Sequence, residues 1–115
     1  MESAKLLVTE FSTADTEYPE IHQVERDVIL KYKDWREQSV EIFFAEPIAF
    51  KWQMVISLSE NERDDTCYEI LDSEWVALHV KEGEISSTEG YVHYKFNFNE
   101  CGQFEILSTQ FTAKT

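Results

Sequence analysis

The chain has 115 residues, of which 43% are hydrophobic and 14% aromatic, and these fractions support a buried core and argue against disorder. Asp and Glu number 23 against 10 Lys and Arg, so the formal net charge is −13. Nucleic acids and anionic membranes are therefore not expected as partners, because binding a polyanion needs a cation-rich surface. The length fits a single domain over residues 1–115, and with 3 Gly and 2 Pro no linker divides it.

The N-terminal residues MESAKLLVTEF contain too short an apolar run for a signal peptide. No stretch of the chain approaches the roughly 20 apolar residues of a membrane span. We therefore expect a cytoplasmic protein, in which Cys67 and Cys101 are reduced because that compartment does not sustain structural disulfides.

Period-two alternation predicts strands in the first half of the chain. A first strand is expected near residues 5–11, followed by an irregular acidic segment at 12–27. The runs VILKYK (28–33) and SVEIFF (39–44) alternate apolar and polar residues and are joined by the polar turn DWREQ, so they predict a hairpin. IAFKWQMV (48–55) continues the alternation after Pro47, and three consecutive antiparallel strands are the simplest interpretation.

The middle of the chain changes character. SLSENERDDT (57–66) is the most hydrophilic stretch and predicts a solvated loop, and CYEIL (67–71) predicts a short strand. A short helix is expected near 74–81, because Asp72 or Ser73 could cap it and apolar residues follow at spacings of three and four. A strand over WVALHV remains an alternative, since its residues also alternate.

YVHYKFNFNECGQFEIL (91–107) predicts a second hairpin, with Gly102 in its turn and STQF extending the returning strand. One face of its first strand would carry Val92, Tyr94, Phe96 and Phe98, and the other would carry Tyr91, His93, Lys95 and Asn97. The whole pattern predicts a mainly β protein of about seven short strands with at most one short helix near 74–81. Its architecture would be an antiparallel sandwich or a strongly bent, barrel-like sheet.

No residue set predicts catalysis, a metal or a cofactor. No pair among His22, His79 and His93 has ligand spacing, and a zinc site built from Cys67, Cys101, His79 and His93 is not favoured. On the predicted hairpin His93 and Cys101 lie more than about 10 Å apart, at roughly 3.3 Å per residue. Glu69, Asp72 and Glu105 merely occupy polar positions beside apolar ones.

Phosphate-binding loops and nucleophile motifs are also missing, so we expect no enzyme. An enzyme of unfamiliar design would require His79 or His93 in a cleft, within hydrogen-bond reach of a carboxylate.

Two features suggest contact with a protein. Trp35 stands in the polar turn beside Arg36, a composition typical of binding hot spots, although packing back over the hairpin is an alternative. A second candidate surface is an acidic face made by Glu60, Glu62, Asp64 and Asp65, which could accelerate the approach of a basic partner.

The segments FKW (50–52), LDSEW (71–75) and HYKFNFNECGQFEIL (93–107) resemble small, acidic, β-rich bacterial proteins of uncharacterised families. Some of these families are encoded beside polymorphic toxins and act as their immunity proteins. The resemblance implies a cytoplasmic inhibitor that binds a toxin directly, and it carries over no functional residue.

We therefore predict a non-enzymatic protein-binding domain that occludes a basic region of a toxin. The alternative is a small-ligand-binding β-barrel or sandwich with aromatic side chains lining a cavity, or a domain without catalytic activity whose role is different. The sequence predicts no oligomeric state.

Overall fold

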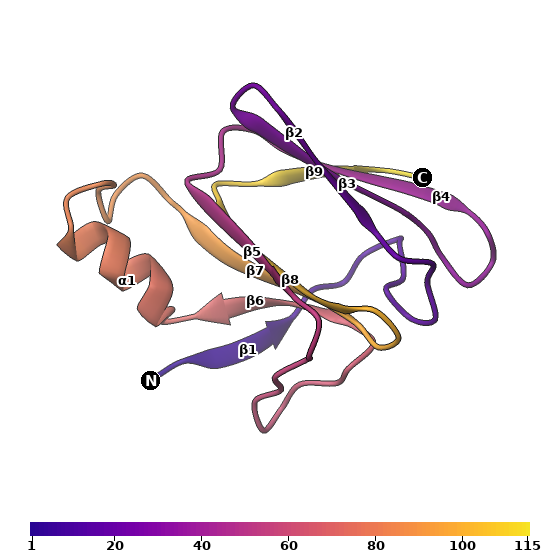
Figure 1. Cartoon of the computed structure of the whole chain (residues 1–115). Coiled ribbons are helices and arrows are strands. Elements are labelled where there is room, and N and C mark those ends of the chain that lie inside the picture. Colours follow the sequence, from indigo (N-terminus) through magenta and orange to yellow (C-terminus); the bar gives the residue numbers. More distant parts are fainter.

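Two antiparallel sheets pack face to face in the computed structural model, which describes all 115 residues (Figure 1). The larger sheet has the strand order β1-β6-β7-β8-β5, with bounds Ser3–Leu6, Cys67–Leu71, Val92–Phe98, Gly102–Ser108 and Ala49–Gln53. The smaller sheet has the order β2-β3-β4-β9, with bounds Glu20–Val24, Asp27–Lys33, Ser39–Phe44 and Phe111–Lys114. The predicted mainly β class is confirmed, and of the two architectures considered the chain adopts the sandwich.

A single helix, α1 (Glu74–Lys81), follows β6 and lies at one end of the larger sheet (Figure 1). Ser73 is its N-cap, and the Ser73 side chain accepts a hydrogen bond from the backbone N–H of Val76. The cap explains why a helix forms here, so the predicted helix is confirmed and the strand alternative is wrong. The structure contains no helix with the length and apolar character that crossing a membrane requires.

The core lies between the two sheets and is rich in aromatic side chains. Phe44 of the smaller sheet lies with its ring 5.9 to 6.4 Å from those of Tyr94, Phe96 and Phe104 of the larger sheet. Because the sequence alternates, these residues all point to one side of their strands, as expected for Tyr94, Phe96 and Phe98. The rings therefore fill the space between the sheets.

Both predicted hairpins are confirmed, as β3–β4 and β7–β8. In the second, Gly102 begins the returning strand with φ +151°. A side chain at this position would collide with the backbone oxygen of Gln53 and approach the Trp52 ring to 2.7 Å. Glycine is required here because strand β5 passes directly against the turn.

The expected order of strands is wrong at two places. Strand β5 does not pair with β4, because the chain crosses to the larger sheet after Phe44 and β5 pairs with β8. The returning strand of the second hairpin ends at Ser108, and residues 111–114 form β9 against β4 in the other sheet. Such crossings depend on contacts between distant segments, which a local pattern does not encode.

The N-terminal quarter also differs from expectation. The first strand covers residues 3–6 rather than 5–11, and the segment predicted to be irregular contains β2. Strand β2 is an exposed edge strand with only two aliphatic residues, Ile21 and Val24, so it lacks a clear alternating signal. The chain consequently has nine strands instead of about seven.

Candidate functional site

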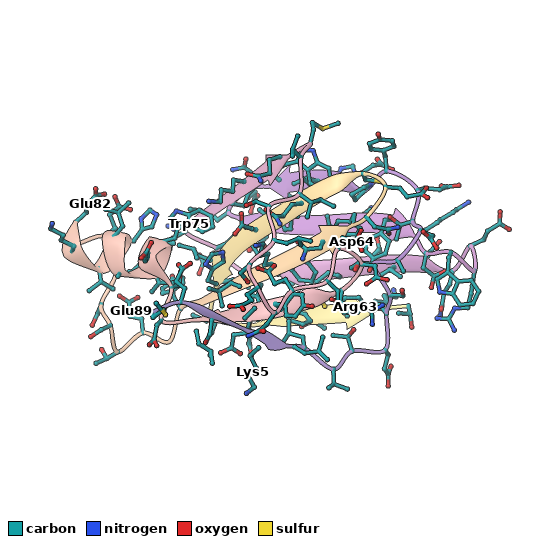
Figure 2. All side chains as sticks on the ribbon, turned by 90° about the horizontal axis from the view of Figure 1, so that it is seen from below. Lys5, Arg63, Asp64, Trp75, Glu82 and Glu89 are labelled. Atoms are coloured by element: carbon teal, nitrogen blue, oxygen red, sulfur yellow. The ribbon has the colours of Figure 1, made fainter.

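The outer face of the larger sheet is the most elaborately built part of the molecule. It is crossed by the β5–β6 loop, defined as residues 54–66, which has no regular secondary structure apart from turns. Figure 2 shows Arg63 and Asp64 of this loop in front of the sheet and Trp75 at the end where α1 lies. Three of the polar side chains that the alternating pattern placed on this face, His93, Lys95 and Asn97, are buried.

An ion pair holds the β5–β6 loop to the sheet. The Lys95 Nζ atom lies 2.9 and 3.0 Å from the two carboxylate oxygens of Glu62. The side chains of Lys95 and Glu62 are only 10% and 1% exposed, respectively. Removing either charge would leave the other buried without a partner, which is far more costly than breaking a surface pair.

Hydrogen bonds surround the Glu62 carboxylate. Ser59 donates to it from both its backbone N–H and its hydroxyl, and the Asn97 amide donates at 3.2 Å. Burial by itself raises the pKa of Glu62, but the hydrogen bonds from Ser59, Lys95 and Asn97 outweigh it, and the pKa lies below its ordinary value. The carboxylate is therefore ionised at neutral pH.

Backbone groups of the loop are bound as well. The Ser57 carbonyl accepts hydrogen bonds from Lys95 at 2.8 Å and from Gln103 at 3.0 Å. The Arg63 carbonyl accepts from Asn97 at 2.9 Å, and the Arg63 N–H donates to the Tyr68 hydroxyl at 2.7 Å. These hydrogen bonds hold the loop against the sheet at both ends of the segment 57–63.

The first residues of the loop are also fixed. The Trp52 indole N–H donates to the Met54 sulfur at 3.0 Å, and the Gln53 amide donates to the Val55 carbonyl at 2.8 Å. Despite these restraints the loop presents apolar side chains to solvent: Met54 is 64% exposed, Val55 76% and Leu58 46%. We call Met54, Val55 and Leu58 the apolar tip.

The four predicted acidic residues of this loop do not behave alike. Glu60 and Asp64 are exposed, Asp65 is half-buried, and the Glu62 carboxylate faces the sheet. Of the four residues expected to form an acidic face, Glu62 is turned toward Lys95, and Glu60 and Asp64 remain exposed. The sequence did not reveal the apolar tip because alternation predicted a strand through residue 55, although the run M-V-I-S-L stands directly before the charged segment.

Trp35 lies elsewhere, in the turn between β3 and β4 of the smaller sheet. Trp35 is 61% exposed, and the Arg36 guanidinium carbon lies 5.5 Å from the centroid of its ring. The buried carboxylate of Asp34 accepts from the backbone N–H groups of Arg36 and Gln38, so the turn has a defined shape. Trp35 does not pack back over the hairpin.

A second group, the His93 cluster, lies beside the loop anchor and comprises Lys51, Ser73, Trp75, His93 and Glu105. His93 Nε2 lies 2.8 Å from Glu105 Oε1, and His93 Nδ1 lies 2.7 Å from Ser73 Oγ. His93 is 6% exposed, and its ring packs edge-to-face against that of Trp75 with centroids 5.2 Å apart. Lys51 lies over the Trp75 ring and 3.7 Å from Glu105.

The protonation of the His93 cluster follows from Glu105. Burial raises the pKa of Glu105, but the hydrogen bond from His93 and the positive charges nearby outweigh it, so that the pKa is lowered overall. The ionised carboxylate can only accept, which requires His93 Nε2 to carry a proton. In the neutral imidazole Nδ1 is then an acceptor, and the Ser73 hydroxyl donates to it.

His93 and Glu105 also line a cleft of about 230 Å³, together with Glu62 and Lys95. Glu105 therefore does more than occupy a polar strand position, and the condition set for an enzyme of unfamiliar design is met at His93. Sequence reasoning missed the cluster because Ser73, His93 and Glu105 come from three separate elements. His79 has a carboxylate partner as well, Glu84, just beyond the end of α1.

The cysteines contribute nothing to this face. Cys67 belongs to the core between the sheets, where burial raises the pKa of its thiol to about 11. The Cys101 thiol is buried next to Thr16, which it contacts at 4.0 Å, and burial raises its pKa too. Both are free thiols that stay protonated at neutral pH. No three His, Cys, Asp or Glu side chains are arranged to hold a metal ion.

Comparison with protein-family models, curated proteins and solved structures finds no match for this chain.

Proposed function

We propose that this protein binds a basic protein partner through the β5–β6 loop. The observation that carries the proposal is a loop without regular structure that is anchored by a buried ion pair and presents the apolar tip to solvent. A loop that is already ordered loses little conformational entropy on binding, so such anchoring favours affinity.

The composition of the loop surface fits this role. Specific interfaces combine a desolvated apolar centre, in which Met is enriched, with a polar rim. The apolar tip would supply the centre, and the exposed Glu60 and Asp64 would belong to the rim. Trp35, on the other sheet, would be a second contact only for a partner large enough to reach it.

Charge favours a basic partner. With a formal net charge of −13, the protein repels acidic proteins and attracts basic ones, and long-range attraction accelerates association. A cytoplasmic immunity protein that occludes a basic region of a toxin, as the sequence resemblance implies, is the form of this function that we favour.

The packing does not favour the alternative of a ligand cavity between the sheets. The aromatic side chains that would have lined such a cavity pack against one another, and Phe44, Phe96, Phe98 and Phe104 have no exposed surface. A small ligand would have to displace these rings, at a cost of several kcal/mol for each one removed from the core.

The test is a binding measurement with a matched pair of variants. A toxin encoded beside the gene is the first partner to try, and a protein captured from the native host is the second. We expect Val55→Asp, in the apolar tip, to raise the dissociation rate by tenfold or more. Val24→Asp, at an exposed valine of the opposite sheet, should leave it unchanged.

Ionic strength provides the second measurement. The association rate should fall steeply between low and high salt, because attraction between exposed charges is screened. If the partner dissociates from the Val55→Asp variant at the wild-type rate, the proposed surface is wrong. If the association rate does not change with salt concentration, the role assigned to charge is wrong.

A further inference from the structure

Ser73, His93 and Glu105 form a continuous hydrogen-bonded chain of hydroxyl, imidazole and carboxylate, with links of 2.7 and 2.8 Å. The carboxylate fixes the proton on Nε2, and the lone pair on Nδ1 faces the serine hydroxyl. A serine with a base in hydrogen-bond reach, and a base held by a third group, is the arrangement that activates a hydroxyl for nucleophilic attack.

We infer that Ser73 is an activated nucleophile that small apolar carboxylic esters acylate, with His93 as general base and Glu105 as the group that orients it. This activity goes beyond the proposed partner binding and does not depend on it, because the β5–β6 loop contributes none of the three residues.

Ser73 lies at the wall of a groove that a substrate could enter. Ser73 and His93 both line a groove of about 500 Å³ between α1 and strands β6 and β7. Most of the remaining wall is apolar and is provided by Ile70, Leu71, Val76, Ala77, Val80 and Val92. Glu69, Asp72 and Lys81 also line the groove, and the apolar part of its wall suits a short aliphatic acyl chain.

The backbone beside Ser73 provides a donor for a developing negative charge. The N–H of Glu74, the first residue of α1, donates at 2.7 Å to a carboxylate oxygen of Glu2. Glu2 is exposed, and the inference requires its carboxylate to give up this donor to the developing oxyanion. Stabilisation of an oxyanion by such an N–H is a recurrent feature of acyl transfer.

The reaction follows from these positions. The Ser73 oxygen attacks the ester carbonyl carbon while its proton passes to His93 Nδ1, and the carbonyl electron pair moves to the oxygen. The tetrahedral intermediate collapses, the carbon–alkoxy bond breaks, and the departing alcohol takes the proton from Nδ1. Water then attacks the acyl-serine by the same route, which releases the carboxylic acid and restores the Ser73 hydroxyl.

Ester hydrolysis and active-serine labelling test the inference on the full chain. We expect the wild-type protein to hydrolyse p-nitrophenyl acetate and butyrate above the buffer rate. A fluorophosphonate probe should add to Ser73, as located by peptide mass spectrometry. His93→Gln should lower the acylation rate by about 10²–10⁴-fold, the usual contribution of a general base.

Two serine variants separate chemistry from folding. Ser73→Asn keeps a side chain that caps helices well but has no hydroxyl, and it should lose both hydrolysis and labelling at an unchanged melting temperature. Ser39→Ala, at an exposed serine of strand β4 in the other sheet, should change neither.

An unlabelled wild-type protein would overturn the inference, as would labelling at a residue other than Ser73. Turnover that survives in Ser73→Asn would do the same. Because the labelled residue is identified on the wild-type protein, the result does not depend on whether any variant folds.

Discussion

The two sheets carry similar polar patterns on their outer faces but use them differently. Across the smaller sheet the register aligns Glu20, Lys31, Glu41 and Lys114 in one row of alternating charge. Across the larger sheet it aligns Lys95, Glu105 and Lys51. The first row lies in solvent, with Lys31 and Glu41 each more than 40% exposed, whereas Lys95 and Glu105 are buried beneath the β5–β6 loop and its neighbours.

Alternation in the sequence therefore shows on which side of a strand a residue lies, but it does not show whether solvent or another part of the protein covers that side. Water solvates the charges of the exposed row, so their pairing contributes little to stability. On the covered face every charge and amide needs a partner from the protein itself. The same residue types therefore contribute little to stability on the smaller sheet, whereas on the larger sheet stability depends on their pairing.

The largest effect is expected from Lys95→Met. The substitution leaves the Glu62 carboxylate, 1% exposed, without its cation, and breaking a buried pair in this way costs about 3–5 kcal/mol. Urea unfolding at neutral pH should show a correspondingly lower free energy of unfolding. A loss below about 1 kcal/mol would mean that the ion pair is solvated and that the two faces do not differ.

A smaller effect is expected from Asn97→Ala. Asn97 bridges the Glu62 carboxylate, the Arg63 carbonyl and the Gln103 amide, so its removal leaves buried polar groups unpaired, at about 1–3 kcal/mol. Hydrogen exchange of residues 57–63 should accelerate because the loop loses a restraint. Thr112→Ala on the exposed face is the control and should leave exchange of this loop unchanged.

Acid should weaken the covered face selectively. Burial raises the pKa values of Glu62 and Glu105, but their hydrogen bonds and neighbouring cations lower them further, so both are net depressed. A depressed carboxyl pKa contributes stability above the unfolded value of about 4.3 and loses it as pH falls through the folded value. Urea unfolding from pH 7 to pH 3 should therefore show falling stability.

The Glu62→Gln variant sharpens this pH prediction. Its deficit relative to the wild-type protein should begin to shrink below about pH 4.3, because the carboxyl group of the unfolded wild-type chain then takes up a proton, and it should be smallest once the pH has fallen through the lower folded-state pKa of Glu62. A deficit that stays constant across the whole range would show that the charge of Glu62 does not matter.

The smallest effect is expected from Lys31→Met on the exposed row. Lys31 and Glu41 lie 3.3 Å apart, yet both remain solvated, and such a pair contributes about 0–1 kcal/mol. The unfolding free energy should change within that range, and 1 M salt should abolish the difference. A loss as large as that of Lys95→Met would contradict the comparison between the faces.

Local signals predicted the secondary structure well. The helix over 74–81 and both hairpins depend on capping, turn residues and alternation within a few residues, and all three were predicted. Sheet membership was not predicted for β5 and β9, because each pairs with a strand from a distant part of the chain.

The site was predicted less well, for the same physical reason. The polar turn around Trp35 left both exposure and packing over the hairpin open, and the structure shows the exposed arrangement. The inward turn of Glu62 depends on Lys95, 33 residues away, and the environment of His93 depends on Ser73 and Glu105. The spacing of residues along the chain does not reveal such contacts between separate elements.

The pairing of distant strands also has a consequence for how the protein folds. Ser3 pairs with Leu71 and Glu41 with Lys114, so each sheet has an edge strand that pairs with a distant part of the chain. Closing such long loops is entropically costly before any contact is made, and domains dominated by non-local pairing fold in about milliseconds to seconds. We expect the hairpins β3–β4 and β7–β8 to form early and the distant strands β1 and β9 to join last. Until they join, two strand edges stay open, and the strong negative charge of the chain then serves to keep folding molecules apart.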